Sequence, residues 1–418
     1  MDRPSILLNF SLLRDNRDFR ALFCARFISV LSLGMLTVAV PVQIQQMTGS
    51  TFQVGVAVIL ASGGMFIGLL LGGVMADRYN RQRLILFARA TCGAGFAGLY
   101  LNTLAAEPSL TLLWLLAVWD GFFGAVGMTA LMAATPALVG RENLGAAGAI
   151  SMLTVRFGAV VSPAIGGIVI AWGDVGWNYA LAALGTWITL IPLIRLPSMP
   201  PPQQPREHPG RALLAGMVFL KQNRVIGAIV LMGTLVSLTS AVRVLFPALA
   251  VGWRIDAWHL GLMYSAIPLG AALGAFTSGR VAQTPRPGRL MIFTAVAGFL
   301  VLSLFSLMPY FILSLCCLAI YGYLSAINAL LQFTLVQSLT PNALLGRVNG
   351  LWTAQAVTGD AFGALLLGTM GTQLLPQTSG LLFGLGAALA CVALAALSAP
   401  LRRLENPPPA QPVSSAGS

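Results

Sequence analysis

Long apolar segments recur along almost the whole chain, and they constrain its fold more than any other feature. A helix needs about 20 consecutive apolar residues to cross the hydrocarbon core of a bilayer, and 57% of the 418 residues are hydrophobic while only 9% are charged. Because the segments are continuously apolar and do not alternate, they predict helices and exclude a membrane β-barrel. We therefore expect an all-α integral membrane protein with twelve transmembrane helices, at residues 21–45, 52–76, 84–105, 109–133, 145–171, 176–196, 225–250, 258–281, 290–308, 310–337, 346–371 and 379–400.

The basic residues predict how these helices are oriented. With a cytoplasmic N-terminus, 20 of the 24 lysines and arginines fall on the cytoplasmic side, Arg89 counted among them, and only Arg254 falls on the outer side. Cytoplasmic loops carry an excess of Lys and Arg, so both termini are expected in the cytoplasm. The net charge of +12 then reflects membrane topology, and we expect no nucleic-acid partner. The N-terminus lacks a cleavable signal, which indicates a multi-pass protein of the inner (cytoplasmic) membrane.

The two halves of the chain are related by an internal repeat. At a shift of 206 residues Pro41 meets Pro247, residues 83–87 meet residues 289–293, and Asp120 meets Ala326. TPALVGREN at 135 also meets TPNALLGRVN at 340 with one extra residue. The repeat therefore predicts two parallel bundles of six helices. The expected domains are an N-terminal six-helix bundle at 1–196, a cytoplasmic linker at 197–224 that is proline-rich and then amphipathic, a C-terminal six-helix bundle at 225–400 and a disordered tail at 401–418.

A loop motif after the second predicted helix, GGVMADRYNRQR, connects this pattern to a known family. It resembles the loop signature of the major facilitator superfamily, and the matching positions are Gly73, Asp77, Arg78, Arg81 and Arg83. Asn80 stands where glycine is usual, and asparagine tolerates a left-handed backbone. In that family the loop Asp pairs with a base after helix 4, here Arg141. The resemblance therefore implies a gate that holds the cytoplasmic side shut, and the alternative is a simple positive-inside anchor.

The fifth predicted helix carries a second motif, GAVVSPAIGG. It resembles the signature of proton-coupled drug exporters in the same superfamily, with Ser162 in place of a glycine, and the matching positions are Gly158, Pro163, Gly166 and Gly167. Proline kinks a helix and glycine lets a neighbouring helix approach closely. The resemblance implies a flexing contact between helices 5 and 8, and the alternative is an ordinary packing face.

Longer stretches extend the resemblance over nearly the whole chain. CARFISVLSLG, VRVLFPAL and LGRVNGLWTAQAVTGD are similar to the enterobactin exporters of enteric bacteria within this superfamily. The superfamily fold places a binding site between its two bundles near the bilayer centre. The resemblance implies secondary active export of a catecholate siderophore from cytoplasm to periplasm, by proton antiport with alternating access. Efflux of several drugs or metabolites is the alternative within the same superfamily.

Five charged residues fall inside the predicted helices, where ionisable groups are candidates for function. Burial favours the protonated form of a carboxylic acid, so Asp120, the deepest, is the leading candidate for proton coupling, and Asp360 is the second. The alternative for either acid is a structural salt bridge with an arginine. The candidates for the substrate cavity are Arg26, Arg156, Arg243, Trp119, Phe123, Tyr323 and Gln355. Arg26 and Arg243 could instead extend to the nearer membrane surface, and the aromatic rings could face lipid or the core.

Other kinds of chemistry have no supporting pattern. The five cysteines lie within apolar segments without metal-site spacing, and the chain has only two histidines and no phosphate-binding loop. We therefore expect no enzyme, no metal and no cofactor. The expected partners are a small-molecule siderophore, protons and the lipid bilayer, and the chain is expected to act as a monomer.

Overall fold

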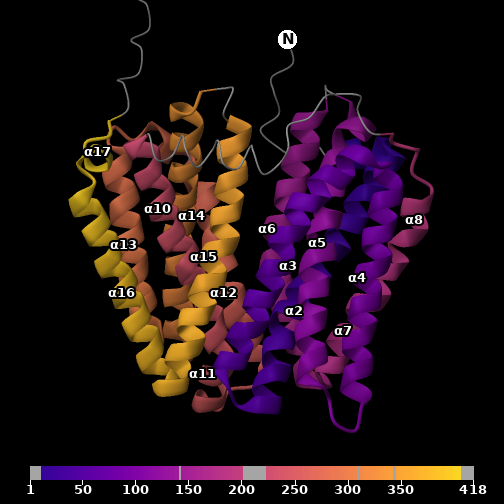
Figure 1. Ribbon diagram of the computed structural model, residues 1–418, viewed down its shortest axis with the longest axis horizontal. Helices are drawn as coiled ribbons and strands as arrows, with labels where there is room; N and C mark the ends of the chain where they lie inside the picture. The colour runs from indigo at the N-terminus through magenta and orange to yellow at the C-terminus, as the bar shows by residue number, and fades with distance from the viewer. Residues whose placement is uncertain (1–10, 141–142, 201–222, 309, 342–344, 406–418) are drawn as a thin grey trace, which may run out of the picture.

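The computed structural model describes residues 11–140, 143–200, 223–308, 310–341 and 345–405, and these residues form helices and connecting loops without a strand (Figure 1). The helices of the first half are α1 (Ser11–Asp15), α2 (Arg17–Thr48), α3 (Thr51–Arg78), α4 (Arg81–Leu104), α5 (Leu110–Val139), α6 (Leu144–Trp172), α7 (Val175–Ile188) and α8 (Leu190–Ile194). Those of the second half are α10 (Arg224–Thr239), η1 (Ser240–Leu245), α11 (Phe246–Trp253), α12 (Ala257–Thr277), η2 (Ser278–Gln283), α13 (Pro287–Phe305), α14 (Phe311–Leu339), α15 (Leu345–Gln373), α16 (Pro376–Leu397) and α17 (Ala399–Arg402). The predicted all-α fold is confirmed.

Within the described residues, eleven spans are long and apolar enough to cross a membrane. The sixth combines α7 with α8, and the seventh combines α10, η1 and α11. The remaining expected span, the eleventh along the chain, is α15, which is 29 residues long and packs against α3 and α10. It lacks a sufficiently apolar window because Asp360 and several other polar residues lie along it. By length and packing α15 completes the expected set, and its polarity indicates that part of it does not face lipid.

Side chains at the loop ends fix where several helices begin. Asn16, Ser109, Asp174 and Asn223 each accept a hydrogen bond from a backbone N–H in the first turn of the following helix, which satisfies one of its orphan donors. Asn80 caps α4 in the same way, through Gln82 N–H and Arg83 N–H at 3.0 and 3.3 Å. Its φ of −59° is not left-handed, so the backbone reason we expected for this Asn80 is wrong. The residue serves as a helix cap.

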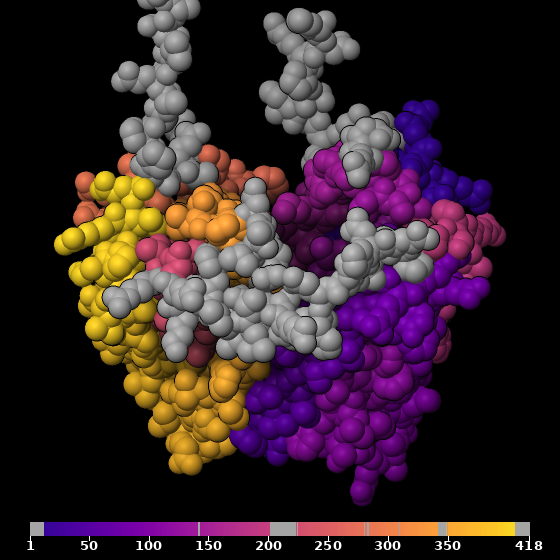
Figure 2. Space-filling view, turned by 45° about the horizontal axis from the view of Figure 1, so that its top comes forward, coloured from indigo at the N-terminus to yellow at the C-terminus, as the bar shows by residue number. Residues whose placement is uncertain are grey.

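The two halves meet on one side of the molecule and separate on the other. In Figure 1 the ribbons of α2–α8 and α10–α16 converge toward α11 and diverge toward the side of α8 and α17. Arg78, Arg81, Arg195 and Arg402 lie at helix ends on the diverging side, which the charge rule assigns to the cytoplasm. Seen from that side, the surface is hollowed between the two halves (Figure 2). The structure is therefore open toward the cytoplasm.

Glycines close the molecule on the outer side. A Cβ on Gly55 of α3 would lie 2.7 Å from the Ala364 carbonyl oxygen of α15 and 3.4 Å from the Gly368 Cα. A Cβ on Gly261 of α12 would lie 2.7 Å from the Pro163 carbonyl oxygen of α6 and 3.0 Å from the Gly167 Cα. Both pairs join one half to the other, so backbones meet there without side chains between them.

Glycine contacts within each half define the register of the repeat. Gly121 packs on Ala61 and Gly322 packs on Ile267. Positions 61 and 267 differ by 206, whereas 121 and 322 differ by 201. The counterpart of Asp120 is therefore Tyr321, and the expected pairing with Ala326 is wrong. The sequence match at residues 135 and 340 does not follow the helices either, because Thr135 lies inside α5 while Thr340 follows the end of α14. Helix α13 is five residues shorter than α4, which accounts for the change of register.

Candidate functional site

A cavity of about 470 Å³ lies between the two halves. Its wall comes from α2, α3, α4, α5 and α6 of the first half and from η1, α12 and α15 of the second. Most lining residues are apolar, among them Leu33, Val58, Met65 and Met128. A largely apolar cavity of this size with a few convergent polar groups is typical of a small-molecule site.

Five ionisable side chains converge on this cavity, and they are Arg26, Arg89, Arg243, Asp120 and Asp360. Four of them are residues that the sequence singled out inside the predicted helices. The fifth, Arg89, was assigned to the cytoplasmic segments, and that assignment is wrong. Arg89 lies inside α4 with 5% of its surface exposed. With Arg89 included, the cavity wall carries three positive and two negative side chains.

Proline places Arg243 in the cavity. Pro247 lacks an N–H, and its ring conflicts with the carbonyl four residues earlier in a regular helix, which is the carbonyl of Arg243. The chain responds with the 3₁₀ segment η1, and the Arg243 carbonyl accepts a hydrogen bond from the Tyr264 hydroxyl at 3.1 Å. The irregular backbone of the seventh span thus lies against the cavity, where polar groups and water can satisfy it.

Arg243 and Asp360 form an ion pair across two helices of the second half. Arg243 Nη2 lies 3.0 Å from Asp360 Oδ1 and 3.2 Å from Oδ2. The Ser240 hydroxyl donates to the same Oδ1 at 2.6 Å, and Arg243 Nε donates to the Ser240 carbonyl at 3.1 Å. The alternative of a structural salt bridge therefore describes Asp360 in this state. Its carboxylate is held by two donors, and the pair remains partly open to the cavity, with 39% and 19% of the two side chains exposed.

Asp120 is held far less firmly. Its Oδ1 is buried and has no hydrogen-bond partner among the described residues. Arg89, on the neighbouring helix α4, interacts with it electrostatically, but the Arg89 Nε is also buried without a partner. The two opposite charges therefore face the same cavity without a direct hydrogen bond between them. A carboxylate in this position can accept a proton or a hydrogen bond from a ligand with little loss of existing contacts.

The other substrate candidates do not line the cavity. Trp119 donates to the Thr91 carbonyl of α4 at 2.8 Å and packs at a tilt of 54° against Phe123, with ring centroids 4.6 Å apart. Tyr323 accepts a hydrogen bond from Thr277, and Gln355 accepts one from Gln332. Arg156 is exposed on α6, although its neighbour Val155 lines the cavity. Successive residues of a helix turn by about 100°, so Trp119 and Phe123 lie about 100° and 60° from Asp120 on the same side of α5. That side faces α4, where the two rings contact Thr91 and Phe87.

The sequence did not identify several polar residues of the cavity wall, among them Arg89 and Tyr264. Arg89 was detectable because it follows the first residue of its apolar run by five positions, which is deeper than a helix end. The link of Tyr264 to the Arg243 carbonyl depends on the proline-induced 3₁₀ turn, and no sequence pattern encodes that contact.

The expected cytoplasmic gate is only partly described. Gly73, Asp77 and Arg78 form the end of α3, and Arg81 and Arg83 begin α4. Arg141, the expected partner of Asp77, lies outside the described residues. The pairing therefore remains a prediction.

The helix 5 motif lies where it can join the two halves. Its Pro163 and Gly167 form the contact with Gly261 of α12 described above, and Gly158 and Gly166 pack instead on Val30 and Met35 of α2. The implied contact between helices 5 and 8 is thus present in the structure. Ser162, the departure from the motif, donates its hydroxyl to the Gly158 carbonyl at 2.6 Å. Whether the contact flexes during transport remains a prediction.

Known proteins share both the sequence and the architecture of this chain. The family described as Major Facilitator Superfamily matches residues 22–356. The chain is 58% identical to the protein named Enterobactin exporter EntS from Citrobacter koseri, over 98% of both chains. It has the same identity and coverage with the protein of that name from Escherichia coli O1:K1 / APEC.

Solved transporters share the fold at low sequence identity. The nucleoside transporter NupG superposes with a TM-score of 0.76 at 14% identity, over 91% of this chain and 98% of that one. A bacterial homologue of the human lysosomal transporter Spinster, solved in an inward-facing and unoccupied conformation, superposes with a TM-score of 0.66 at 15% identity, over 92% and 95%.

Proposed function

Because the chain belongs to the Major Facilitator Superfamily, we propose that it exports a catecholate siderophore of the enterobactin class from the cytoplasm to the periplasm. The chain is a multi-pass protein of the inner membrane and a transporter, not an enzyme. The observation that carries the proposal is the 58% identity, over 98% of both chains, with proteins named Enterobactin exporter EntS.

The chemistry of the cavity suits a catechol. A catechol ring has two adjacent hydroxyl donors on an aromatic face, and carboxylates accept such donors in charge-assisted hydrogen bonds. Arginine can cover an aromatic face, and Arg26, Arg89 and Asp120 all line the first-half wall of the cavity. The apolar wall, with Leu33 and Met128, can cover the rest of the ligand. The excess of one positive charge favours an acidic ligand over a cationic drug.

We assign proton coupling to Asp120. Its unpaired Oδ1 can hold either a proton or a hydrogen bond from a catechol hydroxyl, but not both. Protonation from the periplasm would then displace the siderophore, and loss of the proton to the cytoplasm would prepare the site for the next molecule. Such competition between a proton and the substrate for one carboxylate is the minimum that an antiporter needs. Asp360 is the second candidate, and its ion pair with Arg243 would have to open first.

The proposal includes alternating access, and the glycine contacts between the two halves support it. The glycine contacts at Gly55 and Gly261 close the outer side in this state. Their opening, with closure of a gate around Asp77 and Arg141, would expose the cavity to the periplasm. Rocking of two rigid bundles about a fixed central site is the general mode of such transporters.

Secretion by living cells tests the proposal. Deletion of the chain from a siderophore-producing host should lower intact catecholate siderophore in the medium and raise it inside the cell. Re-expression of the chain should reverse both changes, while a panel of cationic drugs should show unchanged export. Unchanged secretion of the intact siderophore would refute the proposal, and restored export of several unrelated drugs would favour the multidrug or metabolite alternative.

A further inference from the structure

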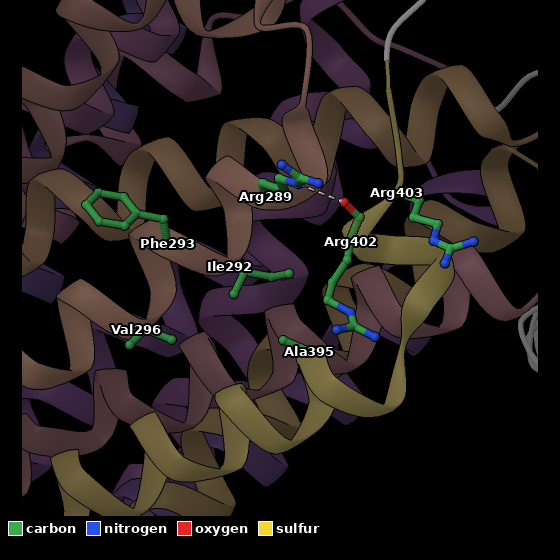
Figure 3. Close-up of a pocket in the computed structure, with 7 residues that line it drawn as sticks. All are labelled: Arg289, Ile292, Phe293, Val296, Ala395, Arg402 and Arg403. Carbon is green, nitrogen blue, oxygen red and sulfur yellow. Dashed lines mark hydrogen bonds between the residues drawn. The ribbon is translucent and has the colours of Figure 1, made fainter.

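A second cavity, of about 640 Å³, lies on the periphery of the second half. It is lined by Arg289, Ile292, Phe293 and Val296 of α13, Ala395 of α16, and Arg402 and Arg403 at the end of α17 (Figure 3). None of these residues lines the central cavity. We refer to this cavity as the arginine groove.

The backbone fixes the basic end of the groove. A Cβ on Gly288 would collide with the Leu401 carbonyl oxygen, so glycine lets α17 pack directly on the start of α13. Arg289 Nε then donates to the Arg402 carbonyl at 3.4 Å, and Arg402 Nη2 donates to the Ala396 carbonyl at 3.1 Å. The three arginines are thereby gathered from two separate helices. Figure 3 shows them at one end of the groove.

Among the described residues, no acidic side chain lines the arginine groove. The acid closest in sequence, Glu405, pairs instead with Arg286 at 3.2 Å. Arg289, Arg402 and Arg403 are all exposed, and no ion pair with a carboxylate is present for them among the described residues. Three uncompensated guanidinium groups make this end strongly attractive to an anion, and a phosphate group matches their geometry.

The other end of the groove is apolar. Ile292, Phe293 and Val296 follow one another along α13, with Ala395 facing them from α16 (Figure 3). Phe293 is 66% exposed, on a helix whose outer surface would lie in lipid. The apolar wall begins one turn below Arg289 and continues toward the membrane centre, as an acyl chain does below its headgroup.

We propose that the arginine groove binds one anionic phospholipid of the cytoplasmic leaflet, with the phosphate on Arg289, Arg402 and Arg403 and an acyl chain along Ile292, Phe293 and Val296. Basic pockets between transmembrane helices on the cytoplasmic side suit such headgroups. A soluble phosphate would use the arginines but not the apolar wall. The inference does not depend on the substrate of the transporter, because the groove shares no residue with the central cavity.

Titration of the purified full-length protein by native mass spectrometry tests the proposal. The probes are phosphatidylglycerol, phosphatidylcholine with the same acyl chains, and inorganic phosphate. We expect phosphatidylglycerol to be retained in preference to phosphatidylcholine, and phosphate to compete weakly. Each of R289Q, R402Q and R403Q should weaken phosphatidylglycerol binding about fivefold, and the triple variant about 100-fold. F293E should also weaken it, because it places a carboxylate against the acyl chain.

The matched control is R195Q, which removes an exposed base at the cytoplasmic end of the first half. It should retain phosphatidylglycerol like the parent protein. Equal binding of the two lipids, or unchanged binding by the triple variant, would overturn the proposal. Competition by phosphate as strong as that by the lipid would show a soluble-anion site instead. Secretion of the siderophore tests the proposed function separately and has no bearing on this result.

Discussion

A methyl group at Gly261 should shift the transporter away from its cytoplasm-open state. In the G261A variant the new Cβ would lie 2.7 Å from the Pro163 carbonyl oxygen and 3.0 Å from the Gly167 Cα. Ordinary C···O contacts begin near 3.3 Å, so the two helices would have to separate by about 0.6 Å. Overpacking of this kind costs about 1–3 kcal/mol. Because the contact joins the halves on the outer side, the strain falls on the state in which that side is closed.

The strain translates into a change of population. A difference of about 1–3 kcal/mol changes the ratio of outward-open to cytoplasm-open molecules about 5- to 150-fold. The assay uses a variant without the five native cysteines and with one cysteine at Val40, which lines the cavity. The rate of labelling by a membrane-impermeant thiol reagent from the periplasmic side should rise in G261A.

The control is G63A, because a Cβ on Gly63 of α3 would meet no atom within 4 Å. Its labelling rate should stay within about twofold of the parent rate, as expected for a substitution that disturbs no contact. Labelling of G261A at the parent rate, with both proteins equally stable, would refute the idea that this glycine contact closes the outer side.

Two further predictions concern hydrogen-bonded pairs. R243M should lower the free energy of unfolding in detergent by about 1–3 kcal/mol. Breaking a fully buried ion pair costs about 3–5 kcal/mol, and the cost is lower here because the Arg243 and Asp360 side chains are 39% and 19% exposed. R243M/D360N should recover part of that loss, giving a coupling energy of at least about 1 kcal/mol, and strictly additive losses would contradict the ion pair. Y179F removes the hydroxyl that donates to Gln43 Oε1 at 2.8 Å, so it should destabilise the first half by about 1–2 kcal/mol without changing the transport rate per folded molecule. A lower rate at unchanged stability would instead assign Tyr179 a part in transport.

The sequence predicted the helices well because each span depends on local composition. Twenty consecutive apolar residues leave a chain in lipid little alternative to a helix, and the described helices coincide with the expected spans to within four residues, except at the end of α5, which extends six residues further. Only α15 falls short of the apolar criterion, and the reason lies in the site, since Asp360 belongs to its cavity face. The family was predicted from the resemblance over nearly the whole chain. Composition, charge pattern and the internal repeat alone predicted only a transporter of two helical bundles.

The candidate site could be predicted only in part, because burial inside a bundle depends on which face of a helix meets which neighbour. Asp120, Arg26, Arg243 and Asp360 were found because charges in lipid are rare. Trp119 and Phe123 share the span of Asp120 but pack toward α4, and a sequence gives no direction for a helix that is apolar all round.

The repeat misled at one point for a related reason. Helix α13 is five residues shorter than α4, so the register between the halves changes at the end of a helix, where no motif marks it. Asp120 therefore corresponds to Tyr321, whose hydroxyl bonds to Thr239 Oγ1 at 2.8 Å. The position still carries an acid in the first half only. The prediction that Asp120 serves function therefore stands, with Tyr321 in place of Ala326 as its counterpart.

Proton-driven accumulation by the D120N variant tests the central claim most directly. The purified protein is reconstituted into vesicles, and intact catecholate siderophore is measured after a pH gradient of one unit is imposed. One-proton coupling supports up to about tenfold accumulation under this gradient. We expect the parent protein and D256N, which alters an exposed acid outside the cavity, to accumulate the siderophore. D120N should equilibrate it without accumulation. Full accumulation by D120N would contradict the assignment of proton coupling to Asp120.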